Sequence, residues 1–349
     1  MGEGPRRIAH AAPPGAAGSV RISVVGAGGW GTAFARLLAR RGHEVVLWAR
    51  DPDRALELDR LRENRTYLPG VLLPRDGLRI TSSLEEVLEP QTVALAVPSF
   101  ALPEVLRAAH PFLRERKTLI NLAKGLDPET GGTLSSRIAA DVPARAVFAL
   151  SGPCHAEEVG RDMPTAVVLA GTDSEVGTAL QTDLSTPLFR VYLSDDLRGV
   201  ELCAAVKNVI ALATGVSDGL GYGDNSRGAL ITRGLAEMTR FGRALGANEG
   251  TFYGLAGVGD LVATCTSEHS RNRAVGLRLG RGEPLAEILA GMRMVAEGVY
   301  ATRLLDRLAE ERGIDMPITR AVLRLLDATA KPLSLVEEIM TRAPKRERD

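Results

Sequence analysis

Two polar side chains interrupt an apolar helical stretch in the second half of the chain. Between residues 202 and 213, Lys207 and Asn208 are the only strongly polar residues. An ammonium group in a buried helix is costly unless its pKa shifts or it finds partners. A lysine with a lowered pKa can transfer a proton near neutral pH. The pattern favours Lys207 as an acid–base catalyst, and a lysine whose tip escapes at a helix edge is the alternative.

A second group of residues could hold an anionic substrate beside that lysine. Gly257-Val258-Gly259-Asp260 places a carboxylate after a glycine turn, where it could orient the ammonium of Lys207. Ser270-Arg271-Asn272-Arg273 opens a predicted helix with Ser270 as its N-cap. A helix N-terminus with two arginines and an asparagine is well suited to bind a phosphate. A negatively charged substrate explains this cluster better than a basic helix start that is merely offset by Glu268.

Three segments of the first half lie where predicted strands end. Lys124, in Asn121-Leu122-Ala123-Lys124-Gly125, is expected to face a cofactor cleft, with a surface lysine as the alternative. Ser151-Gly152-Pro153-Cys154-His155 leads from a strand into a helix, whose N-terminus would let Gly152 and Cys154 contact a phosphate. His155 is more readily explained as structural than as catalytic. Ala96-Val97-Pro98-Ser99 is either the nicotinamide side of such a fold or an ordinary strand end.

The segment expected to bind a cofactor lies near the N-terminus. Between an apolar run at 21–25 and a helical pattern at 30–41, the chain reads Gly26-Ala27-Gly28-Gly29-Trp30-Gly31. Gly26 allows the tight turn, Gly28 lets the backbone approach a pyrophosphate, and Gly31 lets the helix pack on the strand. The helix N-terminus adds N–H groups for the phosphates. The order strand, turn, helix, strand predicts a dinucleotide site, with a plain glycine-rich turn as the alternative.

The residues after the second predicted strand, 44–48, bear on the choice of cofactor. An acidic residue there binds the ribose hydroxyls of NAD, whereas an arginine accepts the 2′-phosphate of NADP. Arg50 lies at about the expected spacing from the glycine turn, and Asp51 follows it. The sequence therefore favours NADP and keeps NAD open. Arg50 could instead be a surface residue paired with Asp51 or Asp53.

Hydrophobic patterning divides the chain into two parts. Apolar runs alternate with helical patterns up to residue 195, which is typical of βαβ units and a largely parallel sheet. The expected strands include 24–25, 45–47, 93–97, 118–120, 147–150, 166–169 and 189–192. Helical periods then continue to about 342, broken by glycine-rich turns at 215–223 and 254–259. We expect a Rossmann-type α/β domain over 21–195 and an all-α domain over 196–342. A disordered extension over 1–20 and a charged tail over 343–349 complete the chain.

Composition excludes several classes of function. The chain has 349 residues, with 43 Lys and Arg against 43 Asp and Glu, so no basic field argues for a nucleic-acid partner. Its three cysteines are far apart, which predicts free thiols in a reducing, cytoplasmic compartment and no metal site. No uninterrupted apolar run reaches the roughly 18 residues of a membrane span. The first residues lack the apolar core of a secretory signal.

Taken together, these motifs resemble the bacterial NAD(P)-dependent glycerol-3-phosphate dehydrogenases over residues 22 to 342. The closely matching segments are 26–33, 64–70, 123–125, 151–158, 201–210, 256–264 and 295–298. The resemblance implies that Lys207 is the general acid–base residue and that Lys124 contacts both cofactor and substrate. It also implies a glycerol phosphate pocket lined by Gly152, the side chain at 154, Asn208, Asp260, Ser270, Arg271 and Asn272. Contacts to the dinucleotide would come from Gly29, Trp30, Arg50, Ala156, Arg271, Val295 and Glu297.

One position departs from the family pattern. Residue 154 is usually Ser or Thr, and here it is Cys154, whose thiol is a weaker hydrogen-bond partner than a hydroxyl. We therefore expect a weaker contact from that side chain and an unchanged contact from its backbone.

The predicted reaction is reversible hydride transfer between a nicotinamide ring and C2 of dihydroxyacetone phosphate. Lys207 protonates the developing alkoxide, Asp260 holds Lys207, and Lys124 adds positive charge. By analogy the product, sn-glycerol 3-phosphate, supplies glycerophospholipid synthesis, and the family suggests a homodimer. A related hydroxy-acid dehydrogenase without a phosphate clamp and a catalytically silent NADP-binding sensor are the alternatives.

Overall fold

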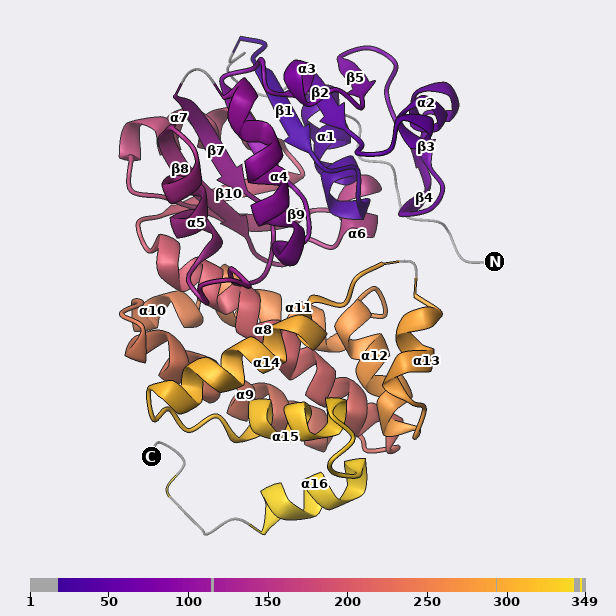
Figure 1. The fold of residues 1–349 in the computed structure, drawn as a ribbon, viewed down its shortest axis with the longest axis vertical. Coiled ribbons are helices and arrows are strands. Elements are labelled where there is room, and N and C mark those ends of the chain that lie inside the picture. Colours follow the sequence, from indigo (N-terminus) through magenta and orange to yellow (C-terminus); the bar gives the residue numbers. More distant parts are fainter. Residues whose placement is uncertain (1–17, 114–115, 293, 342–345, 347–349) are drawn as a thin grey trace.

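The computed structural model describes residues 18–113, 116–292, 294–341 and 346. Most of the expected N-terminal extension and all but one residue of the charged tail lie outside these residues. Figure 1 shows a sheet-containing part above and a helical part below, joined through the long helix α8 (Leu197–Gly219). The last strand of the sheet ends at Ser194. The division of the chain at residue 195 stays a prediction.

The upper part contains one eight-stranded sheet in the order β10-β9-β8-β7-β6-β1-β2-β5. Its strands are β1 (Arg21–Val25), β2 (Glu44–Trp48), β5 (Leu78–Thr81), β6 (Thr92–Leu95), β7 (Lys117–Asn121), β8 (Ala144–Ser151), β9 (Thr165–Ala170) and β10 (Phe189–Ser194). All neighbours pair in parallel except β8 and β9. The mostly parallel, Rossmann-type sheet is therefore confirmed.

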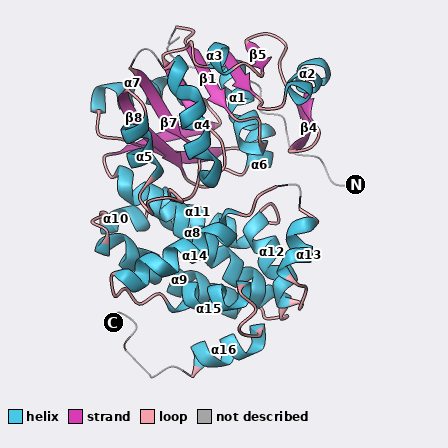
Figure 2. Ribbon diagram, viewed as in Figure 1, coloured by secondary structure: helices cyan, strands magenta, loops and turns pink. Residues whose placement is uncertain are grey.

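Helices cover both faces of this sheet (Figure 2). Alternate residues of a strand point to opposite faces, so Leu119 and Ile120 of β7 enter different cores. One core contains residues of α1 (Gly29–Arg41), α6 (Ala156–Gly160) and α7 (Ser174–Leu184), and the other contains residues of α3 (Leu84–Val87), α4 (Leu102–Ala109) and α5 (Leu134–Asp141). Burial on both faces explains why these strands are continuously apolar.

The structure adds elements that the sequence pattern did not predict. Strand β5 forms one edge of the sheet, and β3 (Glu63–Asn64) pairs with β4 (Leu68–Leu72) in a separate hairpin beside α2 (Pro52–Leu61). The expected strand at 93–97 ends earlier, at Leu95. Two short 3₁₀ turns, η1 (Ser99–Ala101) and η2 (His110–Phe112), flank α4.

The lower part is built around α8. The other helices are α9 (Asp224–Ala244), α10 (Glu249–Phe252), α11 (Asp260–Thr266), α12 (Arg271–Gly280), α13 (Leu285–Ala290), α14 (Glu297–Glu311), α15 (Pro317–Leu326) and α16 (Pro332–Met340). The described residues after Ser194 contain no strand, so the all-α prediction is confirmed.

The prediction of glycine-rich turns at 215–223 and 254–259 was wrong in part. Gly215 and Gly219 lie inside α8 and not in a turn. They are glycines because α12 passes too close to α8 at these positions for a side chain to fit. A Cβ at Gly215 would lie 2.1 Å from the carbonyl oxygen of Arg273, and one at Gly276 would lie 2.1 Å from that of Leu212. Residues 255–259 form a π-helical turn, η3 (Leu255–Gly259), that leads into α11.

Helix α8 also bears on the expectation that no segment spans a membrane. Among the described residues, α8 is the one helix long and apolar enough to do so by length and composition. The relevant window is wholly buried inside the protein, as the core helix of a folded domain would be.

Candidate active site

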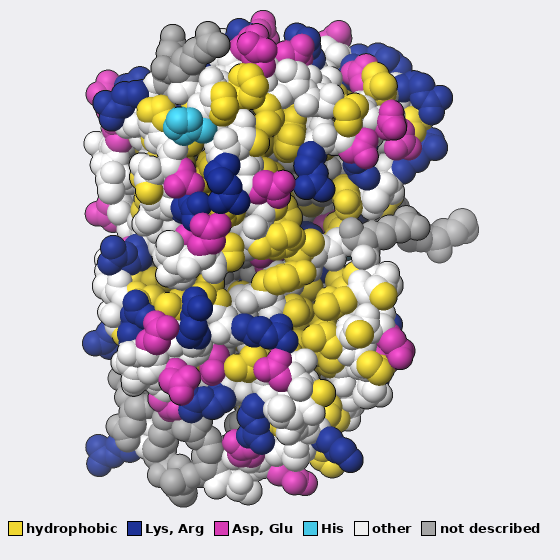
Figure 3. Space-filling model, in the orientation of Figure 1, with side chains coloured by type: hydrophobic (Ala, Val, Ile, Leu, Met, Phe, Trp, Pro, Cys, Tyr) yellow, Lys and Arg dark blue, Asp and Glu magenta, His cyan; other side chains and the backbone are white. Residues whose placement is uncertain are grey.

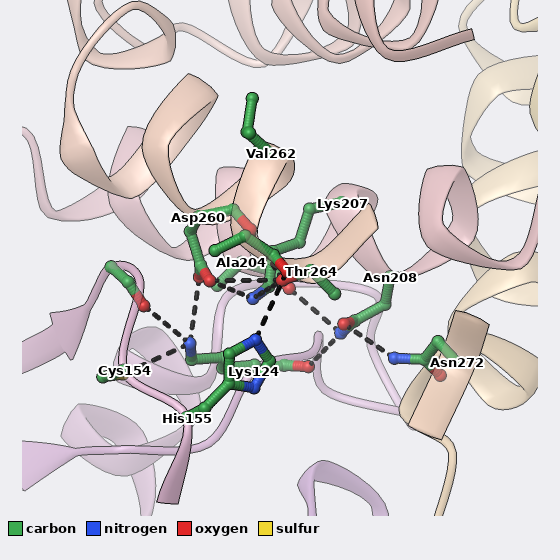
Figure 4. A network of polar contacts seen from close by, with 12 residues as sticks. Lys124, Cys154, His155, Ala204, Lys207, Asn208, Asp260, Val262, Thr264 and Asn272 are labelled. Atoms are coloured by element: carbon green, nitrogen blue, oxygen red, sulfur yellow. Dashed lines mark hydrogen bonds and ion pairs between the residues drawn. The ribbon is translucent and has the colours of Figure 1, made fainter. Parts of the chain in front are cut away.

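Lys124 lies where the sheet meets the helical domain, just after β7 (Figure 4). Its ammonium donates to the carbonyl oxygen of Gly152 at 3.0 Å and to Oδ2 of Asp260 at 2.9 Å. Cys154 Sγ lies 3.4 Å from the same nitrogen. The loops after β7 and β8 thus bring together the three predicted residues of the sheet domain and a carboxylate of the helical domain.

Lys207 faces the same carboxylate from α8. Its Nζ lies 2.5 Å from Asp260 Oδ1 and donates to Thr264 Oγ1 at 2.8 Å. The side chains of Lys207 and Asp260 are only 3% and 2% exposed, so this ion pair is almost free of water. Thr264 was missed by sequence reasoning, although it follows Asp260 by one helical turn and therefore lies on the same face of α11.

Burial and neighbouring charges set the pKa values of these groups. Burial raises the pKa of Asp260, but the ammonium groups of Lys124 and Lys207 outweigh it and hold that pKa below its usual range. Burial, reinforced by the charge of Lys124 and opposed by Asp260, lowers the pKa of Lys207 to about 8. Burial also disfavours the Lys124 ammonium, yet Asp260 raises the net pKa of Lys124 above its usual range. The cluster keeps Lys124 charged and lets Lys207 gain or lose a proton near neutral pH.

Two further groups border this cluster without charge. Burial raises the pKa of the Cys154 thiol, which therefore stays protonated. Burial, together with Lys124 and Lys207, lowers the pKa of His155, whose Nε2 lies 3.4 Å from the carbonyl oxygen of Ala263. A neutral His155 bonded to backbone agrees with the structural role that its sequence context favours.

The two predicted asparagines link the domains through their amides. Asn208 Nδ2 donates to the carbonyl oxygens of Lys124 and Ala204, each at 3.1 Å. Asn272 Nδ2 donates to Asn208 Oδ1 at 2.9 Å, and Asn272 Oδ1 accepts from the amide of Gly298 at 2.9 Å. Most of their hydrogen-bonding capacity is therefore used within the protein, and one amide N–H of Asn272 has no partner among the described residues.

The expected phosphate clamp is only partly assembled. Ser270 caps α12, as predicted, by accepting from the amide of Arg273. Arg273 turns away to Asp218 of α8, with Nη2 and Oδ2 2.7 Å apart, so the prediction of two clamping arginines was wrong. Arg271 is exposed and forms no hydrogen bond or ion pair with any described residue. Of the two arginines, Arg271 is therefore the one without a partner among the described residues.

The glycine turn before α1 has the shape that a dinucleotide needs. A Cβ at Gly31 would lie 2.0 Å from the carbonyl oxygen of Gly26, and one at Gly26 would lie 2.6 Å from that of Ala96. Gly26 also has φ +117°, a conformation that favours glycine. By contrast, nothing lies within 4 Å of a Cβ at Gly28. The first two contacts fix the turn, and the open space at Gly28 lets a pyrophosphate approach.

The neighbourhood of that turn offers a second sign of a ligand. The indole Nε1 of Trp30 is buried and has no hydrogen-bond partner among the described residues. A Cβ at Gly29 would lie 2.7 Å from the carbonyl oxygen of Tyr67 and 3.6 Å from the Cβ of Ala156, which begins α6. A buried donor at the N-terminus of α1 fits a dinucleotide whose acceptor groups reach this point.

Arg50 and Asp51 lie after β2 and differ in how they are used. Asp51 caps α2, with its Oδ1 accepting from the amide of Asp53 at 2.9 Å. Arg50 is exposed and has no hydrogen bond or ion pair with the described residues, so the alternative pairing with Asp51 or Asp53 is absent there. Arg50 is thus available for an anion, whereas Oδ1 of Asp51 is engaged in capping α2.

Glu297 opens α14, and Val295 lies two residues before it. Val295 is half-buried. The carboxylate of Glu297 accepts from the amide of Ser99 at 2.9 Å and from its hydroxyl at 2.5 Å. The described residues contain no group of three or more His, Cys, Asp or Glu side chains that could hold a metal ion.

The sheet, its dinucleotide turn and the buried lysine of a second, helical domain define a two-domain dehydrogenase that uses a nicotinamide dinucleotide. Sequence comparison agrees. The family profile described as NAD-dependent glycerol-3-phosphate dehydrogenase N-terminus matches residues 21–177, and the C-terminus profile matches 196–337. The chain therefore belongs to the NAD-dependent glycerol-3-phosphate dehydrogenase family.

Individual relatives support this assignment over nearly the whole chain. The glycerol-3-phosphate dehydrogenase [NAD(P)+] of Geobacter metallireducens is 49% identical over 94% of this chain and 99% of its own. That of Pelotomaculum thermopropionicum is 46% identical over 94% and 95%. The crystal structure of glycerol-3-phosphate dehydrogenase from Coxiella burnetii, 40% identical, superimposes with a TM-score of 0.89 over 93% of this chain and 99% of that one.

Proposed function

We propose that this chain reduces dihydroxyacetone phosphate to sn-glycerol 3-phosphate, reversibly, with NADPH or NADH. The observation that carries the proposal is the buried arrangement of Lys124, Asp260 and Lys207, in which two ammonium groups share one carboxylate at the junction of the domains. Membership in an NAD(P)-dependent family and the fit of the glycine turn to a dinucleotide support it.

Each residue of the cluster has a separate role in the reduction. The bound dinucleotide supplies the hydride. Lys207, as ammonium, gives a proton to the oxygen on which negative charge develops, and its pKa of about 8 suits transfer in either direction. Lys124 stays positive and stabilises that oxygen. Asp260 holds both nitrogens in place, and Thr264 fixes the position of Lys207 Nζ.

Binding of the phosphate would orient the ketone at a distance from the reacting atoms. We assign this role to Arg271, with Ser270 and the remaining N–H of Asn272. Gly152 and Cys154 lie on the loop that the Lys124 ammonium contacts. Binding energy from the phosphate can then position the carbonyl group for hydride addition.

For the cofactor, we propose a preference for NADP over NAD. The unpaired Arg50 can accept a 2′-phosphate in a bidentate arrangement, while Asp51 is engaged as a helix cap. Gly29, Trp30, Ala156, Arg271, Val295 and Glu297 are proposed as further contacts to the dinucleotide.

We further propose a cytoplasmic homodimer whose product feeds glycerophospholipid synthesis. The three cysteines are free and buried in the structure, which is compatible with a reducing compartment. The dimer and the metabolic role rest on analogy with the family.

The decisive experiment follows the loss of reduced-nicotinamide absorbance with dihydroxyacetone phosphate, using NADPH and NADH in parallel. Wild type should oxidise both, and Lys207→Ala should lose activity by roughly 10²- to 10⁴-fold. Lys117→Ala is the matched control, because Lys117 is also buried but bonds the carbonyl oxygen of Glu89 outside the cleft. Binding of dinucleotide without turnover by folded wild-type protein would defeat the proposal and favour a sensor.

A further inference from the structure

Two short segments meet across the boundary of the domains, beside the charge cluster. Ser99 opens η1, after β6, and Glu297 opens α14. The Glu297 carboxylate accepts from both the amide and the hydroxyl of Ser99. One residue further along η1, the ring of Phe100 lies 5.0 Å from that of Tyr300, which is one turn along α14. On the face shown in Figure 3, hydrophobic side chains gather along this boundary.

The inner and outer contacts differ in exposure. Ser99 is 5% exposed, whereas Phe100 and Tyr300 are 39% and 53% exposed. Ser99 and its bonds to the carboxylate therefore lie deeper than the aromatic pair, which is partly exposed to solvent. We call these four residues, Ser99, Phe100, Glu297 and Tyr300, the clasp.

The clasp leaves no room for a side chain at Gly125. A Cβ there would lie 2.5 Å from Ser99 Oγ and 3.4 Å from Glu297 Oε2. Gly125 directly follows Lys124, so the backbone next to the lysine that faces Asp260 packs against the clasp. The position of Lys124 is thereby coupled to the contact between Ser99 and Glu297.

A chain of hydrogen bonds also connects the start of α14 to the backbone of Lys124. Gly298, next to Glu297, donates to Asn272, which donates to Asn208, which donates to the carbonyl oxygen of Lys124. The backbone at 124–125 is therefore held from one side by α8 and from the other by the clasp. The contact from α8 belongs entirely to the helical domain that carries Lys207. The clasp takes Glu297 and Tyr300 from that domain.

We propose that Ser99 is a positioning residue for the reaction, acting through Glu297 and Gly125, and that the aromatic pair reinforces it. Lys124 belongs to the sheet domain, and Lys207 and Asp260 belong to the helical domain. The two ammonium groups can share one carboxylate only while the domains keep this orientation. The clasp fixes that orientation at the edge of the cleft nearest β6. This inference rests on the proposed function.

The test uses Ser99→Ala in the full-length protein, with two independent readouts. Hydrogen exchange of the free protein should increase about tenfold at the amides of 99–101 and 298–300, because one of the two bonds to Glu297 is lost. The value of kcat should fall about tenfold, and the isotope effect on kcat with 4-deuterated NADPH should rise, since misalignment slows hydride transfer. The Kd for NADPH, measured by fluorescence, should rise no more than about threefold, because the glycine turn is intact and Glu297 keeps its bond to the Ser99 amide.

Variants of the aromatic pair provide matched controls. Tyr300→Ala should show the same pattern as Ser99→Ala at smaller size, whereas Tyr300→Phe keeps the ring and should behave as wild type. Leu333→Ala removes an exposed side chain of α16 away from the clasp and should also have no effect.

Each negative outcome has a distinct meaning. Normal kcat and isotope effect in Ser99→Ala despite faster exchange would show a purely structural contact and overturn the positioning role. Unchanged exchange would show that the hydroxyl does not join the domains, which also overturns it. Absence of turnover in wild-type protein would defeat the proposed function. Hydrogen exchange is measured on the free protein and needs no turnover, so it would still test whether Ser99 joins the domains.

Discussion

The glycine turn at 26–31 offers backbone N–H groups and open space to an anion, whereas Lys124, Asp260 and Lys207 offer buried side-chain charge. The turn depends on the absence of side chains, because a Cβ at Gly26 or Gly31 would collide with backbone. The cluster depends on its charged side chains, because each charge offsets the free-energy cost of burying an opposite one. One site is therefore sensitive to added atoms and the other to lost charge.

The two regions also differ in how their parts are encoded. The turn is a single run of residues between one strand and one helix. The cluster takes one residue from the loop after β7, one from α8 and one from α11, so it exists only when both domains are folded and aligned. Substitutions in the two regions should therefore separate binding, catalysis and stability.

The largest effect should come from Asp260→Asn. Both lysines lose their counter-ion, so kcat should fall by roughly 10²- to 10⁴-fold and the free energy of unfolding by about 3–5 kcal/mol. Steady-state kinetics and urea denaturation measure the two changes. Asp218→Asn is the control, because Asp218 is a buried carboxylate that pairs with Arg227 and Arg273 outside the cluster. Equal losses of activity in the two variants would contradict a special role for Asp260.

Gly28→Ala should separate dinucleotide binding from folding. No described residue lies within 4 Å of the added methyl group, so the thermal midpoint should stay unchanged, while the Kd for NADPH should rise at least about tenfold. Gly31→Ala should instead lower the thermal midpoint, because its methyl group meets the backbone of Gly26. Fluorescence titration and thermal unfolding distinguish the two. Wild-type affinity in Gly28→Ala would mean that the pyrophosphate lies elsewhere.

The pH dependence of the two reaction directions should be opposite. Reduction needs the Lys207 ammonium, so its kcat/KM should fall about tenfold per unit above the pKa of about 8. Oxidation of glycerol 3-phosphate needs the neutral amine, so its kcat/KM should fall about tenfold per unit below that pH. Profiles measured in both directions test this, and parallel profiles would exclude Lys207 as the proton carrier.

The smallest effect should come from Cys154→Ser. A hydroxyl would form a stronger hydrogen bond to the Lys124 ammonium than the thiol, which lies 3.4 Å from it. We expect the KM for dihydroxyacetone phosphate to change by no more than about threefold. A change of tenfold or more, measured by initial rates, would give the side chain at 154 a larger part in binding than its geometry suggests.

The sequence predicts local features, such as strand bounds and helix caps, better than contacts between residues that are far apart in the chain. Strands β1 and β2 have the bounds that their apolar runs indicate, and Ser270 caps α12 as its position suggests. Arg273 could not be assigned in this way, because its partner Asp218 lies far away in the sequence and meets it only where α8 and α12 pack through their glycines. The same holds for Ser99 and Glu297, which no local pattern relates.

The burial of α8 has a consequence for how the chain is made. This helix could cross a membrane by length and composition, and the helices from α9 onward that help to shield it are synthesised after it. While the ribosome is still adding those helices, α8 has only part of its cover, so chaperones would have an apolar segment to bind. A chain that stops soon after residue 219 would leave the uncovered part of that segment exposed and prone to aggregate.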